Sequence, residues 1–201
     1  MPVLQRVPEY FLLSCLAFIL CSPYMAAQTD ASANKAGTQA TSEERDGQHD
    51  FDFAFGNWKV HTRRLLHPLT GSNEWVEFDG TSVVRPIWEG RANTEEYEGK
   101  SLSGHADGLT VQTYSPTSHQ WSIYWTNSKN GAFSLPPTVG KFTNGRGEFY
   151  DQEDFNGTKI FVRYLWLLPS PDKPRWEQAF SADGGKTWET NYIVTYARVK
   201  Q

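Results

Sequence analysis

The sequence predicts an all-β protein whose folded domain is an antiparallel up-and-down β-barrel of about ten strands. From Trp58 onward, short runs of alternating apolar and polar residues follow one another, and turn residues separate them. No comparable stretch has a persuasive helical period. The chain is also 14% aromatic, with 16 Gly and 11 Pro, which suits a fold of short strands and tight turns. Sequential short strands favour a closed barrel, because closure removes the exposed edges of a sheet.

The strands are expected where the alternation is clearest and where turn residues bound it. Side chains of like character recur at every second position, so each strand should have one face toward the interior. The alternation does not decide which face that is. The expected strands are residues 58–66, 75–84, 91–97, 109–114, 121–126, 140–143, 148–151, 159–166, 175–181 and 187–198.

The N-terminal residues 1–27 are predicted to be a signal peptide. The apolar run Phe11–Cys21 is too short to span a bilayer well, and small residues follow it. Cleavage is expected after Ala27 or after Ala33, with an uncleaved anchor as the alternative. The protein is therefore expected to be exported, either to the periplasm or out of the cell, with no membrane span in the mature form.

Residues 28–48 contain no aromatic and no bulky apolar side chain, so they are expected to form a flexible linker. The barrel domain is expected over residues 49–199. Both cysteines, Cys15 and Cys21, fall in the predicted signal peptide. A mature domain without cysteine excludes thiol nucleophiles, zinc–thiolate sites and iron–sulfur clusters.

The charge balance and the histidines exclude further classes. Lys and Arg number 19 against 23 Asp and Glu, a net charge of −4, which argues against a dedicated nucleic-acid-binding protein. The five histidines lack the close spacing of a metal site. The sequence thus predicts no metal, no cofactor and no nucleic-acid partner, and it leaves the oligomeric state open.

Two motifs at the ends of the domain indicate how the barrel closes. Gly56-Asn57-Trp58 begins the first strand and Arg198 ends the last. A closed barrel brings these strands together, so Arg198 is expected to stack on Trp58 and to hydrogen-bond nearby carbonyl groups. Gly56, Trp58 and Arg198 are therefore assigned to barrel closure.

At this point the chain resembles the calycin superfamily, which includes the lipocalins and the fatty-acid-binding-like barrels and whose signature is Gly-x-Trp with a late basic residue. The segment 50–53 (DFDF) running into Gly56, together with residues 181–191 (SADGGKTWETN), is similar to a group of exported, mostly bacterial lipocalin-like proteins of unknown function. The resemblance covers nearly the whole mature domain. It implies a fold and a cavity, and it carries over no catalytic residue.

The segment Ser181–Trp188 also fits the sequence of the sialidase Asp-box, S-x-D-x-G-x-x-W. One copy cannot build a propeller, so the segment is interpreted as a structural hairpin. Asp183 should cap turn amides, Gly185 should accept a positive φ, and Trp188 should pack beneath the turn.

The faces that mix large aromatic residues with a few polar groups predict an interior that holds a ligand, with a dry core as the alternative. Arg64 shares the face of Trp58 and is expected to meet an anionic group, although an exterior ion pair is an equal alternative. The segment 131–137 (GAFSLPP) has the character of a lid over a barrel mouth, or of an ordinary long loop. The residues expected to line the ligand site are Arg64, Trp125, Tyr164, Trp166, Trp176, Gln178 and Tyr192.

The favoured function is therefore the binding of a small hydrophobic or amphipathic molecule, with no catalytic residue assigned. One alternative is a small hydrolase or isomerase that uses an inward Glu177 or Glu77. Another is an envelope module whose exposed aromatic residues bind a protein or a polysaccharide.

Overall fold

A computed structural model describes residues 45–101 and 104–200 of the chain. The predicted signal peptide and the linker as far as residue 44 lie outside the described residues. The elements are η1 (Asp52–Ala54), β1 (Gly56–Leu65), β2 (Trp75–Ile87), η2 (Trp88–Gly90), β3 (Ala92–Ser101), β4 (Gly104–Ser115), β5 (Gln120–Asn127), β6 (Thr138–Thr143), β7 (Arg146–Phe155), β8 (Thr158–Leu167), β9 (Arg175–Ser181) and β10 (Glu189–Arg198), where η marks a 3-10 turn.

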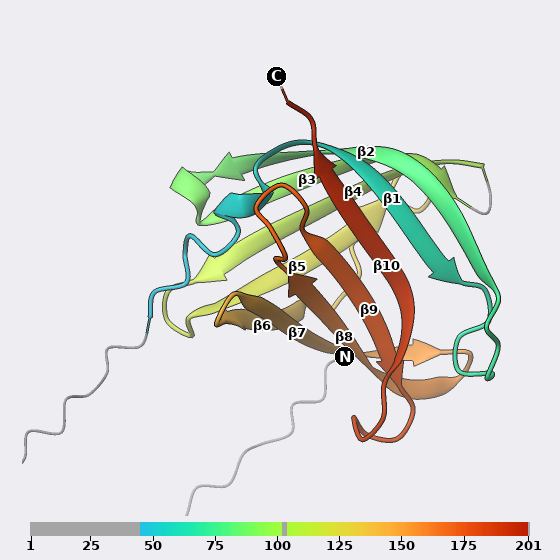
Figure 1. The fold of residues 1–201 in the computed structure, drawn as a ribbon. Coiled ribbons are helices and arrows are strands. Elements are labelled where there is room, and N and C mark those ends of the chain that lie inside the picture. Colours follow the sequence, from blue (N-terminus) through green and yellow to red (C-terminus); the bar gives the residue numbers. More distant parts are fainter. Residues whose placement is uncertain (1–44, 102–103, 201) are drawn as a thin grey trace, which may run out of the picture. The chain divides into compact units, whose positions relative to one another are not determined.

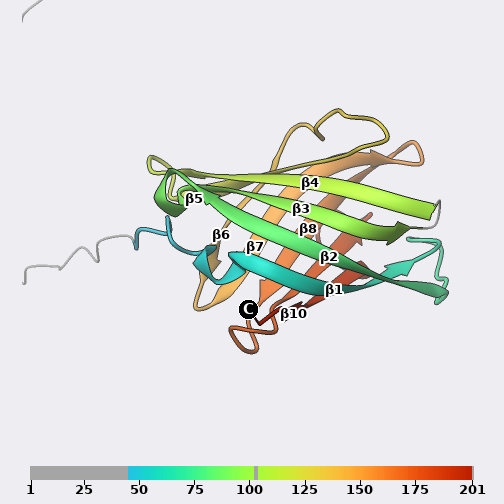
Figure 2. The same cartoon turned by 90° about the horizontal axis from the view of Figure 1, so that it is seen from above.

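The ten strands form one closed antiparallel barrel in which each strand pairs with the next and β10 returns to β1 (Figure 1). In the view from above, β1 to β4 lie along one side and β8 to β10 cross on the other (Figure 2). This confirms the predicted all-β up-and-down barrel. The chain follows the simplest route available, since neighbours in sequence are neighbours in the sheet.

Each predicted strand overlaps an observed one, but several observed strands are longer. β4 begins at Gly104 and not at Leu109, because residues 104–108 continue the ladder with β3 as far as the pair Ser101 and Gly104. The added residues are glycine, alanine, histidine and aspartate, which interrupt the alternation. Pairing with a neighbouring strand therefore extends strands beyond what local sequence indicates.

The register settles which faces point inward. On β1, Trp58, Val60 and Thr62 are buried, and their neighbours Lys59 and His61 are not. The inward face of β8 runs from Ile160 through Val162 and Tyr164 to Trp166, and it pairs with Gln178 and Trp176 of β9. Every aromatic face identified by alternation on these strands is the interior one.

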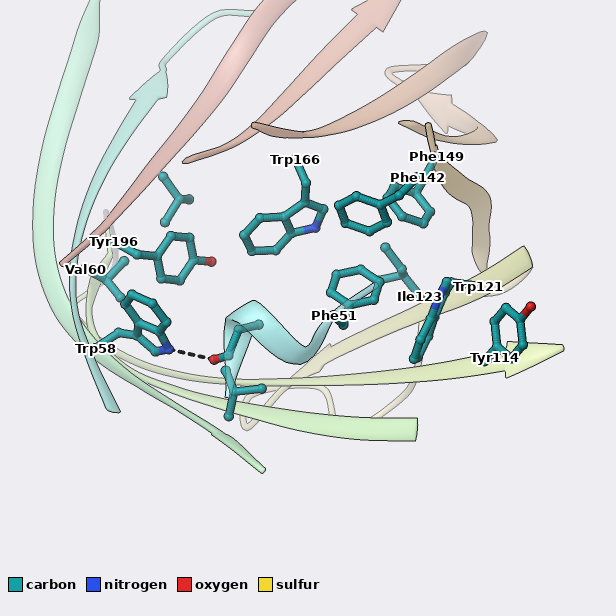
Figure 3. Close-up of a cluster of buried hydrophobic side chains, with 13 residues drawn as sticks. Phe51, Trp58, Val60, Tyr114, Trp121, Ile123, Phe142, Phe149, Trp166 and Tyr196 are labelled. Atoms are coloured by element: carbon teal, nitrogen blue, oxygen red, sulfur yellow. Dashed lines mark hydrogen bonds between the residues drawn. The ribbon is translucent and has the colours of Figure 1, made fainter. Parts of the chain in front are cut away.

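One end of the barrel is filled with packed aromatic rings. Phe51, immediately before η1, is fully buried and meets Trp121 edge-on at 4.9 Å and Phe142 at 5.0 Å between ring centroids (Figure 3). The Nε1 of Trp58 donates to the carbonyl of Ala54 at 2.7 Å. The segment before β1 thus inserts into the barrel and forms its closed end.

Residues before the expected domain start also contact this end. Gly47 donates its amide hydrogen to the hydroxyl of Tyr114 at 3.1 Å, and its carbonyl accepts from Nε1 of Trp121 at 3.0 Å. Gly47 is itself buried. These hydrogen bonds fix the chain against β4 and β5 before it enters η1.

Arg198 joins the first and last strands at this end. Its guanidinium lies 4.1 Å above the ring of Trp58, its partner in register. The same group donates to the carbonyls of Phe53 and Phe55 at 2.8 Å each, and its Nε pairs with Asp172 at 2.7 Å. Gly56 has a φ of 124° and a Cβ there would lie 3.1 Å from this guanidinium, so the position suits glycine.

At the opposite end, the β1–β2 loop crosses part of the opening. Leu69 of this loop packs against the inward side chains Ile160, Val162 and Phe180. Its backbone amide donates to Glu189 Oε1 at 2.6 Å, where β10 begins. The loop therefore covers the side of the opening bounded by β8, β9 and β10.

Candidate functional site

The inward residues of the middle of the barrel keep solvent-accessible surface, unlike those of the closed end. Trp125 points inward on β5, since it pairs with Thr110 in the same register as buried Ile123 with Gln112, yet it is 43% exposed. Phe149 and Trp121 at the closed end are 0% exposed. The barrel thus has a dry core at one end and an accessible lumen beyond it, except beneath the β1–β2 loop, where Ile160, Val162 and Phe180 are buried.

Three of the predicted site residues line this lumen as one aromatic wall. The rings of Tyr164 and Trp176 lie 4.9 Å apart, and those of Trp176 and Tyr192 lie 5.8 Å apart. Gln178, between them on β9, donates from Nε2 to Asn191 Oδ1 at 2.9 Å. All these side chains keep some exposed surface except Asn191, which is buried.

Trp166 was predicted to join this wall and lies deeper. It is 4% exposed and packs against Phe53 and Tyr196 at 5.5 Å each in the closed-end cluster. Arg64, by contrast, is exposed near the open end of β1, on the inward register. The predicted set is therefore spread from the floor of the lumen to its rim.

Tyr97 is a lumen residue that the sequence reasoning missed. It lies inward on β3, and its side chain lies close against two glycines, because a Cβ on Gly80 or Gly99 would come within 2.7 Å of it. Glycine inside a strand pattern often marks such a close approach. The two glycines were the available signal.

Polar groups meet where Tyr97 faces Tyr192. Burial raises the pKa of each phenol, and the hydroxyl of Thr62 opposes that rise, whereas the hydroxyl of Tyr97 donates to the carbonyl of Lys100 at 3.3 Å. The positive charge of Arg64 acts in the opposite direction and lowers the pKa of Tyr192. The phenol of Tyr192, the hydroxyl of Thr62 and the guanidinium of Arg64 are groups that can bind an anionic oxygen group.

The other side of the lumen is acidic. Asp151 and Glu153 of β7 pair in register with the inward residues Val162 and Ile160. Burial raises the pKa of both carboxyl groups, and the charge of Asp151 raises that of Glu153 further. Burial, together with the charge of Glu153, also raises the pKa of Tyr164 to about 12.

A polar group of side chains lies at the floor of the lumen. Glu95 on β3 accepts hydrogen bonds at Oε1 from Ser82 at 2.6 Å and from Tyr196 at 3.3 Å. Burial raises the pKa of Glu95 despite these donors. Glu95 also lines a cavity of about 10 Å³ together with Asn93 and Gln112.

The two carboxylates considered for catalysis do not face the lumen. Glu177 pairs in register with Ile193 on the outer face and forms an ion pair with Arg175 at 2.6 Å. Glu77 is also outward and pairs with Arg63 at 3.1 Å. Glu95, Asp151 and Glu153 are instead on the inward face, as is Glu189, which pairs in register with Phe180 and accepts from the amide of Leu69.

The β9–β10 hairpin is built around Asp183. Its Oδ1 accepts from the amides of Lys186 and Thr187 at 3.0 and 2.9 Å, and Ser181 Oγ accepts from Gly185 N at 2.9 Å. The hydroxyl of Thr187, which donates to Asp183 Oδ2 at 2.6 Å, lowers the pKa of Asp183 most, and the amide of Thr187 lowers it further. Gly185 has a φ of 86° and its carbonyl accepts from Trp188 Nε1 at 3.0 Å, so the hairpin has the geometry expected of a structural turn.

The segment 131–137 lies beside β5. Ser134 N donates to the carbonyl of Trp125 at 2.9 Å, and Phe133 packs on the outward ring of Tyr124 at 6.3 Å. Leu135 is 73% exposed. The loop that contacts the lumen side chains is the β1–β2 loop.

Within residues 45–101 and 104–200, no group of three or more His, Cys, Asp or Glu side chains is placed to hold a metal ion. The same part of the chain has no helix of the length and apolar character needed to cross a bilayer.

The sequence matches no family model and no curated protein sequence. Among solved structures, it is similar to the S-type phycobiliprotein lyase CPES from Guillardia theta, with a TM-score of 0.50 and 11% identity over 78% of this chain and 94% of that one. The fold is calycin-like.

Two further structures resemble the calycin-like barrel less closely. Rv2717c from M. tuberculosis gives a TM-score of 0.49 at 9% identity, covering 78% of this chain and 99% of that one. A de novo designed fluorescence-activating β-barrel gives 0.40 at 16% identity, covering 78% and 100%. The 11% identity with the phycobiliprotein lyase shows a shared fold alone.

Proposed function

We propose that the calycin-like barrel binds a small amphipathic molecule in the accessible half of its lumen. The observation that carries the proposal is the contrast between the two ends, with inward Trp125 43% exposed and Phe149 at the closed end fully buried. A large aromatic side chain that points into a barrel and stays accessible is available for an apolar ligand.

The wall residues define what such a ligand presents. Its apolar part packs against Trp125, Trp176 and Tyr164. An anionic group is oriented by Arg64 at the rim, with the hydroxyl of Tyr192 nearby. The proposal concerns binding, and no covalent step is assigned.

Titration with anilinonaphthalene sulfonate, an aromatic anion, tests this function by its fluorescence increase. Trp125→Ala should weaken binding about tenfold, because it removes an aromatic contact from the lumen. Arg64→Gln should weaken it by a smaller factor and reduce its dependence on salt.

Trp88→Ala is the matched control, since Trp88 is 67% exposed at η2, outside the lumen. This variant should bind the dye as the unaltered protein does. Binding that is lost equally in both tryptophan variants, or in neither, would mean that the dye does not report on the lumen.

Export remains part of the proposal on the basis of the N-terminal sequence. Fractionation of the source cells, with N-terminal sequencing of the recovered protein, tests it. Recovery from the cytoplasm with an intact N-terminus would contradict export without affecting the binding proposal.

A further inference from the structure

The floor of the lumen contains buried polar atoms that have no partner. Asn93 is fully buried, and neither its Oδ1 nor its Nδ2 has a hydrogen bond. Gln112 is 4% exposed, and its Oε1 is also unpartnered. The two residues are direct neighbours across β3 and β4, yet no hydrogen bond to another protein group satisfies these atoms. A buried amide without partners costs stability, so a pair of them on one inward face needs an explanation.

Both amides line the cavity of about 10 Å³ that Glu95 also lines. We call this cavity, with Asn93, Glu95 and Gln112, the floor chamber. A cavity of that volume admits roughly one water-sized group. Whatever enters the floor chamber is therefore a single polar atom with its hydrogens, and not a whole headgroup.

The free atoms of the floor chamber select the chemistry of that group. Nδ2 of Asn93 and Nε1 of Trp166 are donors and need an acceptor, whereas Oδ1 of Asn93 and Oε1 of Gln112 need donors. An ammonium group only donates, and would leave Nδ2 unsatisfied. A carboxylate only accepts, and would face two amide oxygens and the carboxyl of Glu95. A hydroxyl donates once and accepts, and so can satisfy both kinds of atom.

The floor chamber lies directly below the proposed ligand site. Glu95 is followed two residues later on β3 by Tyr97, and Trp166, which also lines the chamber, is preceded on β8 by Tyr164. Residues two apart on a strand lie about 7 Å apart on the same face. The lumen side chains therefore stand immediately above those of the chamber.

We infer that the floor chamber binds a hydroxyl group of the lumen ligand, so that the ligand is a hydroxylated amphipathic anion whose charged end lies at Arg64. This inference rests on the proposed binding function. Val60, which pairs with Tyr196 beside Glu95, is four residues from Arg64 along β1, a span of about 13 Å. That length suits a medium-chain carboxylate with a hydroxyl at the far end.

The hydroxyl group in the floor chamber has two sources, the ligand and a water molecule. A pair of ligands distinguishes between them. Decanoate and 10-hydroxydecanoate differ only in the terminal hydroxyl. Each is used to displace anilinonaphthalene sulfonate from the full-length protein. The hydroxylated acid should displace the dye at about tenfold lower concentration, because its hydroxyl gains hydrogen bonds that decanoate lacks.

Variants of the floor chamber should remove that preference. Asn93→Leu keeps the size of the side chain and deletes both unpartnered atoms, and Gln112→Met serves if Asn93→Leu fails to fold. In either variant the two acids should displace the dye equally well. Thr126→Val is the matched control, since Thr126 also has a buried, unpartnered hydroxyl but lies on the outward register of β5.

Equal displacement by the two acids in the unaltered protein would overturn the inference, and would assign the floor chamber to water. Failure of 10-hydroxydecanoate to displace the dye, or a preference that survives both floor-chamber variants, would overturn it as well. None of these results changes how the dye binds when no acid is present, and that binding should remain sensitive to Trp125→Ala. Failure of the proposed function is distinguishable, because it would abolish that dye signal.

Discussion

The two ends of this barrel differ in the environment of single side chains. At the closed end, Arg198 places one guanidinium over Trp58 and on the carbonyls of Phe53 and Phe55. The planar fork of arginine makes these contacts together, which the ammonium of lysine cannot do. At the other end Arg64 has an exposed side chain. Two arginines on the inward register thus have different environments, one fixing the fold and the other available to a ligand.

Glu95 makes stability depend on pH. Burial raises the pKa of its carboxyl in the folded protein above the ordinary value of 4.5. The folded state therefore holds this proton to a higher pH than the unfolded state does, and stability falls as pH rises from 4.5 through the folded-state pKa. Glu95→Gln should remove this loss, so the variant should lose less free energy of unfolding between pH 4.5 and pH 8 than the unaltered protein, as measured by urea denaturation.

Glu96→Gln is the matched control, because Glu96 is the next residue on β3 but is exposed and paired with Arg85 at 2.6 Å. Its variant should keep the pH dependence of the unaltered protein. If the stability of Glu95→Gln depended on pH as that of the unaltered protein does, a group other than Glu95 would cause the dependence.

Within the strands, glycine residues allow the backbones of neighbouring strands to approach closely. A Cβ on Gly140 of β6 would lie 1.9 Å from the carbonyl oxygen of Glu148 on β7. That contact is with backbone and cannot be relieved by turning a side chain. Gly140→Ala should therefore destabilise the protein by about 3 kcal/mol or more, measured as a shift in the urea midpoint.

Gly108→Ala provides the comparison, since a Cβ there meets its nearest neighbours, Trp125 and Tyr97, at an ordinary 3.5 Å. The free energy of unfolding should change by less than about 1 kcal/mol. Similar destabilisation by both substitutions would show that β6 and β7 adjust to the added methyl group.

Alternation along the strands predicted the barrel and grouped its inward residues correctly, because a strand has a period of two in any barrel. It could not choose the interior face, since the outer face of β1 also carries a regular series, Lys59, His61 and Arg63. The choice comes from closure with β10 and from Phe51, whose burial depends on contacts distant in sequence. Neither the closure with β10 nor the contacts of Phe51 can be inferred from local sequence.

The same reasoning explains which inward residues the pattern identified. Tyr164, Trp176 and Tyr192 are large, inward and aromatic, so their pattern identifies them. Asn93 and Glu95 are polar and inward, and a rule that assigns polar residues to the surface passes over them. Trp166 was placed in the lumen because its type matches, whereas its depth depends on how far the segment before β1 inserts.

The molecule as a whole should be unevenly stable along the barrel axis. Backbone amides near the closed end lie over packed rings such as Phe149 and Trp121, and those near the opening border accessible surface. Hydrogen exchange should therefore be slowest at the closed end, because exchange there requires the core to open. Bound anilinonaphthalene sulfonate should slow exchange mainly around Trp125 and Tyr192. Uniform protection along the axis would contradict a barrel with two distinct halves.

The pairing of β1 with β10 has a consequence for the order in which the fold is assembled. During synthesis β1 is made first of the ten strands, and its second edge has no partner until β10 emerges. An unpaired strand edge can add to another chain, and charged side chains along it discourage this. The outward series Lys59, His61 and Arg63 lies on that strand, and it would keep nascent chains apart until Arg198 reaches Trp58 and closes the ring.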